Sequence, residues 1–86
     1  MRFYVISGVA GMTGNELVRQ ILSRSIEDKV LGFDNFYASS LETLADCLDD
    51  ERFTFLEYDL NNKENMRDVE ERVCQAKKRC SGVDLY

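Results

Sequence analysis

The sequence contains no histidine among its 86 residues. Without an imidazole, the chain cannot supply a Ser-His-Asp or Cys-His nucleophile, a histidine-ligated zinc site or a histidine pH switch. It also has no proline and only 5 glycines, a composition unlike that of collagen or of a disordered linker. With 44% hydrophobic and 31% charged residues, we expect one small globular domain.

Cysteines and long apolar runs are also scarce. The 3 cysteines are odd in number and form no C-x-x-C pair, which argues against a disulfide framework and a zinc ribbon, so no metal site is expected. The apolar run from Phe3 to Ile6 is too short for a signal peptide or a membrane span. We therefore expect a protein of the reducing cytoplasm that has no membrane partner.

The charge balance is acidic, with 11 Lys and Arg against 16 Asp and Glu and a formal net charge of -5. Binding to nucleic acid needs clustered basic residues that contact phosphates, so no nucleic-acid partner is expected. The one basic cluster, at 77–79, falls in the last turn of a predicted helix. Positive charge is favourable there because that end of the helix dipole is negative.

Strand-like and helix-like segments alternate along the chain. Apolar and β-branched runs predict strands, and apolar residues at helical intervals predict amphipathic helices. The predicted order is a strand at 2–6, a helix after residue 14, a strand at 29–34, a helix at 39–49, a strand at 52–59, a helix from 61 or 62 to 80, and the start of a strand at 83–86. This alternation predicts an α/β fold with parallel strands joined by helical crossovers.

The segment 7–14 carries the strongest chemical signal. Its glycines, Gly8, Gly11 and Gly14, stand between a predicted strand and a predicted helix. A helix that begins there presents unpaired N–H groups and the positive end of its dipole, and glycines let a pyrophosphate approach closely. Because Asn and Glu follow the last glycine where a P-loop has Lys and Ser or Thr, a nucleoside triphosphate site is not expected.

Asp34 follows the last of these glycines by 20 residues, at the end of the second predicted strand. A carboxylate in this position accepts hydrogen bonds from both hydroxyls of an adenosine ribose and repels a 2′-phosphate. No Lys or Arg stands at 35–39 to neutralise such a phosphate, so NAD is favoured over NADP. Asp59 and Leu60, at the end of the third predicted strand, are placed to face the adenine edge.

In combination, these segments resemble the extended short-chain dehydrogenase/reductases, in particular the NAD-dependent sugar-nucleotide epimerases and dehydratases. The resemblance rests on the glycine segment 8–14, on 32–36 with its Asp-Asn pair, on 55–60 and on 83–86. It implies that residues 1–86 form the N-terminal half of a Rossmann fold, with parallel sheet order 3-2-1, the start of strand 4 and no substrate domain.

The same resemblance implies a set of contacts to the cofactor. The family usually has an aromatic residue and Ile where this chain has Met12 and Thr13. The implied contacts are the backbone at Met12 and Thr13 with the flanking Gly8, Gly11 and Gly14 for the pyrophosphate, Asp34 and Asn35 for the adenosine ribose, Ser39 in the loop beside it, and Asp59 with Leu60 for the adenine.

The catalytic pair of the family is missing from this sequence. Family members transfer hydride with the help of a Tyr-x-x-x-Lys pair, but the residues four positions after Tyr4, Tyr37 and Tyr58 are Gly, Leu and Asn. We therefore expect the NAD-binding portion of a UDP-sugar-like epimerase or dehydratase, incomplete for catalysis, with a nucleotide-sugar substrate only in a full-length context.

Two alternatives stay open at this point. One is a non-catalytic module that senses a dinucleotide. The other is a structural remnant that binds nothing and pairs with another chain through its sheet edge. We expect the first strand to form that edge, so that the isolated protein self-associates or is marginally stable.

Overall fold

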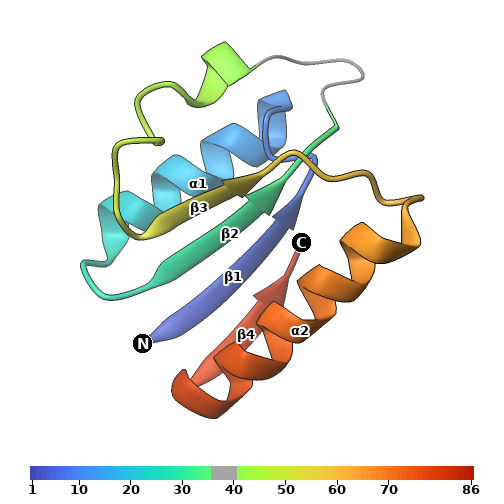
Figure 1. Ribbon diagram of the computed structural model, residues 1–86. Helices are drawn as coiled ribbons and strands as arrows, with labels where there is room; N and C mark the ends of the chain where they lie inside the picture. The colour runs from blue at the N-terminus through green and yellow to red at the C-terminus, as the bar shows by residue number, and fades with distance from the viewer. Residues whose placement is uncertain (36–40) are drawn as a thin grey trace.

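The computed structural model of the chain describes residues 1–35 and 41–86. In this part of the chain the strands are β1 (Arg2–Ser7), β2 (Lys29–Phe33), β3 (Phe53–Leu56) and β4 (Gly82–Leu85). The helices are α1 (Met12–Arg24), the short 3-10 helix η1 (Leu41–Leu44) and α2 (Lys63–Arg79). The strands form one parallel sheet in the order β3-β2-β1-β4 (Figure 1), which confirms the predicted α/β fold and strand order.

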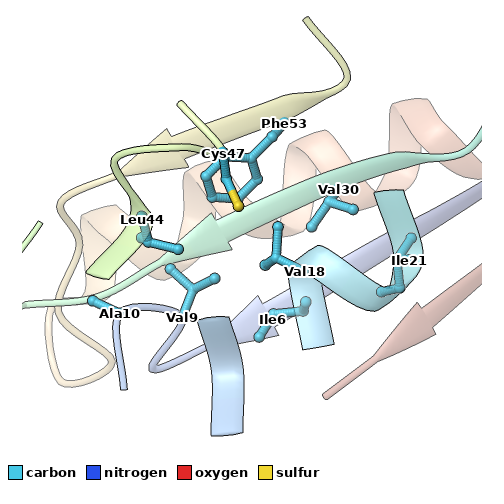
Figure 2. Packing of buried hydrophobic residues seen from close by; sticks show 9 residues of the cluster. All are labelled: Ile6, Val9, Ala10, Val18, Ile21, Val30, Leu44, Cys47 and Phe53. Carbon is cyan, nitrogen blue, oxygen red and sulfur yellow. The ribbon is translucent and has the colours of Figure 1, made fainter. Parts of the chain in front are cut away.

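Helices cover both faces of the sheet, with α1 and η1 on one face and α2 on the other (Figure 1). Neighbouring residues of a strand serve opposite faces: Ile6 packs on the α1 side, whereas Val5 packs on the α2 side. Figure 2 shows the core cluster on the α1 side, which consists of Ile6, Val9, Ala10, Val18, Ile21, Val30, Leu44, Cys47 and Phe53. Two residues of the glycine segment therefore belong to the core.

The apolar stripe of α2 faces the sheet as predicted. Val69 and Ala76 are buried, and Met66 and Val73 pack against the core cluster that contains Val5, Leu31 and Phe33. The N-cap is Asn62, whose side chain accepts a hydrogen bond from the N–H of Asn65 at 3.0 Å. No helix in the described ranges is long and apolar enough to cross a membrane.

The prediction that β1 forms a sheet edge is wrong. β4 pairs with β1 in parallel from Arg2 to Val5, so β1 has a neighbour on both sides. The Arg2 guanidinium also donates hydrogen bonds to the Asp84 carboxylate at 2.9 and 3.0 Å. Even this short strand satisfies the N–H and C=O groups on that side of β1. An edge-to-edge contact with another chain would have to use β3 or β4.

The prediction of a helix at 39–49 is wrong in extent. η1 spans Leu41–Leu44 and is followed by turns, in which the N–H of Cys47 donates to the carbonyl of Leu44 at 2.8 Å. Leu44 and Cys47 are both buried, and residues three apart lie on the same side of a 3-10 turn. This tight winding therefore buries both side chains without a full α-helix.

Candidate functional site

The carboxyl ends of β1, β2 and β3 lie side by side at one edge of the sheet. The parallel register pairs Ser7 with Phe33, and Phe33 with Leu56. The segments that follow these strands therefore leave the sheet together. In open parallel sheets, ligands bind outside this edge. The sequence-predicted contacts in the described residues all follow β1, β2 or β3.

The glycine segment forms a tight turn between β1 and α1. Gly8 has a φ of +62°, a left-handed conformation that favours glycine. The N–H of Gly11 donates to the carbonyl of Gly8 at 3.0 Å, and the N–H of Val9 donates to the carbonyl of Phe33 at 3.2 Å. The second of these bonds ties the turn to the end of β2.

Gly14 serves the contact between helix and turn. A Cβ atom at this position would lie 2.5 Å from the carbonyl oxygen of Gly8 and 2.8 Å from the Cα of Val9. Both of these atoms belong to the backbone, which cannot move aside without a change in the turn. Gly14 therefore lets α1 pack directly on the residues that precede it.

α1 begins at Met12 rather than after Gly14, with Gly11 as its N-cap. Gly11 has no side chain that could occupy the first N–H groups, and these groups have no partner inside the helix. Met12 is 89% exposed, and Thr13 is exposed as well. The start of α1 therefore presents N–H groups and the positive end of a helix dipole at the surface, an arrangement that binds anions.

A series of polar contacts through Asn15, Arg19 and Asp46 stabilises the glycine turn. The side-chain amide of Asn15 donates to the carbonyl of Gly11 at 2.6 Å, and the N–H of Asn15 donates to the same carbonyl at 3.0 Å. Arg19 donates to the side chain of Asn15 and forms an ion pair with Asp46 at 2.9 Å. The hydrogen bond from Arg19 lowers the pKa of Asp46. These contacts connect the turn to the segment after η1.

Asp34 lies beside the glycine turn. Only 9% of its surface is exposed, and its N–H donates to the carbonyl of Leu56 at 3.2 Å. The carboxylate Oδ2 accepts a hydrogen bond from the N–H of Ala10 at 2.9 Å. The side chain predicted to bind a ribose is thus next to the turn predicted to bind the pyrophosphate.

The remaining predicted contacts are Asn35, Ser39, Asp59 and Leu60. Asn35 is exposed directly after Asp34. The N–H of Asp59 donates to Oδ1 of Asn65 at 3.0 Å, and Leu60 is 62% exposed. Ser39 lies outside the described residues. The structure therefore brings the glycine turn and Asp34 together and places Asp59 and Leu60 after the neighbouring strand.

Sequence reasoning missed three parts of this edge. A Cβ atom at Gly32 would lie 2.6 Å from Cγ2 of Val9, so this glycine makes room for the turn. A glycine inside an apolar strand is a known sign of close approach, and this signal was available. The other two parts are the hydrogen bond from the N–H of Ala10 to Asp34 and the hydrogen bond from the N–H of Asp59 to Asn65. Both depend on tertiary contacts, which leave no pattern in the sequence.

Surface hollows of the described residues include one on α1 and one between α2 and the sheet. One of about 500 Å³ runs along the start of α1 and is lined by Met12, Thr13, Asn15, Glu16, Leu17 and Gln20. A larger one of about 650 Å³ lies beside α2 at the amino ends of the strands, with Met1, Phe3 and Lys29 in its wall. The larger hollow is at the opposite end of the strands from the glycine turn, so we associate only the smaller one with the candidate site.

Within residues 1–35 and 41–86, no group of three or more His, Cys, Asp or Glu side chains is placed to hold a metal ion. What the carboxyl edge offers instead is an anion-binding helix start and a nearly buried carboxylate. These groups suit a ligand that carries both a phosphate and a diol.

Comparison with known proteins gives a family match and similar folds. The sequence model described as "NAD dependent epimerase/dehydratase family" matches residues 4–77. Among curated proteins, dTDP-glucose 4,6-dehydratase of Shigella flexneri is 39% identical over 57 residues, which are 65% of this chain and 16% of that protein.

Two solved structures share the fold over 100% of this chain. A dTDP-glucose 4,6-dehydratase from Bacillus anthracis in complex with NAD matches with a TM-score of 0.79 and 17% identity. A UDP-Glc/GlcNAc 4-epimerase from Campylobacter jejuni matches with a TM-score of 0.75 and 23% identity. The chain spans 26% and 24% of the lengths of these two structures. The observed sheet matches the N-terminal Rossmann part of the dehydratase.

Proposed function

Because the chain belongs to the NAD-dependent epimerase/dehydratase family, we propose that it binds NAD as the cofactor-holding portion of a sugar-nucleotide epimerase or dehydratase. The observation that carries this proposal is the hydrogen bond between the Asp34 carboxylate and the N–H of Ala10. It joins a carboxylate suited to a ribose diol to a turn suited to a pyrophosphate.

The start of α1 is the proposed pyrophosphate site. The backbone N–H groups of Met12 and Thr13 would donate to phosphate oxygens, and the glycines around them keep Cβ atoms out of the way. Glu16 is exposed, and the first turn of α1, all of it described, contains no acidic residue. An anion at the helix start is therefore favoured by the helix dipole and the backbone N–H groups, whereas Glu16, which lines the same hollow as Met12 and Thr13, opposes it.

Asp34 and Asn35 are the proposed ribose contacts. The Asp34 carboxylate accepts hydrogen bonds from hydroxyls and would repel a 2′-phosphate. No Lys or Arg stands at 35–39, so the residues that follow Asp34 supply no positive charge to neutralise that phosphate. This supports NAD rather than NADP as the cofactor.

Asp59 and Leu60 are the proposed adenine contacts, with Ser39 beside the ribose. A carboxylate can accept a hydrogen bond from the exocyclic amine of adenine, and an exposed leucine can cover the flat ring. Leu60 has 62% of its surface available for such a contact. The three proposed subsites then follow β1, β2 and β3 in turn.

NAD, when bound, supplies the hydride acceptor for oxidation of a sugar carbon. The 86 residues include no Tyr-x-x-x-Lys pair. The role that we propose for these residues is therefore to bind and orient the cofactor. The catalytic pair and the contacts to a nucleotide sugar would have to come from outside them.

Isothermal titration calorimetry tests the proposal with NAD and NADP as ligands. The wild-type chain is expected to bind NAD at least about tenfold more tightly than NADP. In NADP a phosphate replaces the 2′-hydroxyl, so the carboxylate loses a hydrogen bond from that hydroxyl and is repelled by the phosphate. Asp34→Asn keeps an oxygen that can accept from the N–H of Ala10 but loses the charge, and it is expected to weaken NAD binding by a similar factor.

Asp84→Asn is the matched control, since Asp84 pairs with Arg2 in β1, away from the glycine turn. We expect it to leave NAD affinity unchanged. Absence of NAD binding by a folded wild-type chain would refute the proposal and favour a remnant that binds nothing. Equal affinity of wild type and Asp34→Asn would remove Asp34 from the site.

A further inference from the structure

The segment between β3 and α2, residues 57–62, is tied to α2 by the side chain of Asn65. Oδ1 of Asn65 accepts from the N–H of Asp59 at 3.0 Å, while its own backbone N–H donates to Oδ1 of Asn62 at 3.0 Å. One residue of α2 therefore holds two positions that bracket Leu60. The segment is fixed relative to the first turn of the helix.

Tyr58 provides a second tie between this segment and α2. Its hydroxyl donates to Oδ2 of Asp68 at 2.6 Å, and Nε of Arg72 donates to the same oxygen at 2.8 Å. The hydrogen bond from Tyr58, together with that from Arg72, lowers the pKa of Asp68, and the same bond raises the pKa of Tyr58. At neutral pH the carboxylate is thus charged and the hydroxyl keeps the proton that it donates.

The side chains of α2 that hold this segment lie on one side of the helix. Asn65, Asp68 and Arg72 are spaced by three and four residues, which brings their side chains next to one another along the helix surface. The ring of Tyr58 also packs against the core cluster beneath α2. The segment is therefore anchored by hydrogen bonds at Asp59 and by both packing and a hydrogen bond at Tyr58.

Asp59 is oriented within the segment as well. Its Oδ1 accepts from the N–H of Asn61 at 2.9 Å, which forms a local turn around Leu60. A carboxylate can recognise the amino group of a base only if its position is fixed, and a site that is ordered before binding avoids the entropic cost of ordering on binding. The ties to α2 supply that order.

We infer that Asn65, assisted by the Tyr58–Asp68 hydrogen bond, is a positioning residue that makes the adenine end of the site selective for the 6-amino group of the base. This inference rests on the proposed function. Asn65 acts through the backbone of Asp59, whose N–H its side chain holds.

The test compares NAD with nicotinamide hypoxanthine dinucleotide, in which a carbonyl acceptor replaces the 6-amino donor. Calorimetry measures both ligands on the wild-type chain, on Asn65→Ala and on Tyr58→Phe. The wild type is expected to prefer NAD by about tenfold, since the hypoxanthine carbonyl would face a carboxylate. Asn65→Ala is expected to lower this preference to about twofold or less, because the N–H of Asp59 loses its tie to α2. Tyr58→Phe keeps that tie and loses only the bond to Asp68, so it is expected to lower the preference by a smaller factor.

Two further variants separate positioning from general structural damage. Asn65→Asp keeps an oxygen that can accept from the N–H of Asp59, and it is expected to retain the preference for NAD. Gln75→Ala removes an exposed side-chain amide further along α2 and should change nothing. A purely structural role of Asn65 would weaken both dinucleotides equally and leave their ratio unchanged.

The outcomes distinguish this inference from the proposed function. If the wild type binds NAD and the ratio is the same in wild type, Asn65→Ala and Tyr58→Phe, the inference fails and the proposed function stands. If the folded wild type binds neither dinucleotide, both fail. Circular dichroism monitors folding, and Tyr58→Phe, which keeps its ring in the core, decides the matter if Asn65→Ala does not fold.

Discussion

The carboxylate of Asp34 accepts a hydrogen bond from the backbone N–H of Ala10 at 2.9 Å. This contact joins the end of β2 to the glycine turn after β1. Ala10 is 1% exposed, so its N–H is out of reach of solvent. Asp34 therefore has a structural role in the turn in addition to its proposed role as a ribose ligand, and the two roles can be separated by substitution.

Asp34→Ala is expected to destabilise the fold more than Asp34→Asn. Alanine removes the oxygen that accepts from the buried N–H of Ala10, and loss of this hydrogen bond costs about 1–3 kcal/mol, whereas asparagine retains an acceptor oxygen. Urea unfolding followed by circular dichroism measures the difference. The same free energy of unfolding in both variants would mean that the bond to Ala10 contributes nothing to the turn.

Gly14→Ala is expected to destabilise the chain by about 1–3 kcal/mol, because a Cβ atom 2.5 Å from the carbonyl oxygen of Gly8 forces α1 away from the turn. Gly82→Ala is the control. Its Cβ atom would meet the Arg2 guanidinium at 2.7 Å, and that flexible side-chain end can move aside. Thermal melting compares the two variants, and a larger loss for Gly82→Ala would contradict the packing described for Gly14.

Gly32→Ala should disturb the turn from the β2 side, since its Cβ atom would lie 2.6 Å from Cγ2 of Val9. Val9→Ala removes both γ-carbons, although the Cβ of residue 9 would remain 2.9 Å away. The double variant is therefore expected to be more stable than the sum of the single effects by about 0.5 kcal/mol or more. A double-mutant cycle in urea provides the measurement, and strict additivity would argue against the contact.

Much of the fold was predictable because each element carries its own periodic signal. The run at Val5 and Ile6 and the apolar stripe from Met66 to Ala76 are local patterns, and the structure confirms a strand and a helix there. The extent of the helix at 39–49 was not predictable, since burial of Leu44 and Cys47 depends on how closely this segment approaches α1 and the sheet.

In the candidate site, too, features with a local sequence pattern were predictable and features that depend on tertiary contacts were not. The glycine turn and Asp34 were predictable because their spacing follows from the strand–turn–helix geometry. The contact of Gly32 with Val9 and the bond from Asp59 to Asn65 join parts of the chain whose relative position only the folded structure defines. The pairing of β4 with β1 depends on a register between the two ends of the chain.

Acid is expected to weaken the fold below about pH 4. Hydrogen bonds from Arg19, Arg52 and Tyr58 lower the pKa values of Asp46, Asp50 and Asp68, respectively. The folded pKa values therefore lie below the unfolded value of about 3.9, so the stabilisation is present above that value and is lost as the pH falls through the folded values.

Urea unfolding at a series of pH values tests this expectation. Asp68→Asn should flatten the acid decline, because one of the carboxylates with a lowered pKa is gone. High salt should also reduce the decline, since these ion pairs are partly exposed. Stability that rises as the pH is lowered from 5 to 3 would contradict the assignment of these ion pairs.

The most direct test of NAD binding at the glycine turn is a titration of the ¹⁵N-labelled chain with NAD, followed by amide chemical shifts. The backbone N–H groups of Met12, Thr13 and Gly14 and those of Asp34 and Asn35 are expected to show the largest shifts, and NADP at the same concentration should shift them less. If saturating NAD leaves the amides of both segments unmoved, or moves only residues elsewhere, the proposed cofactor site is wrong.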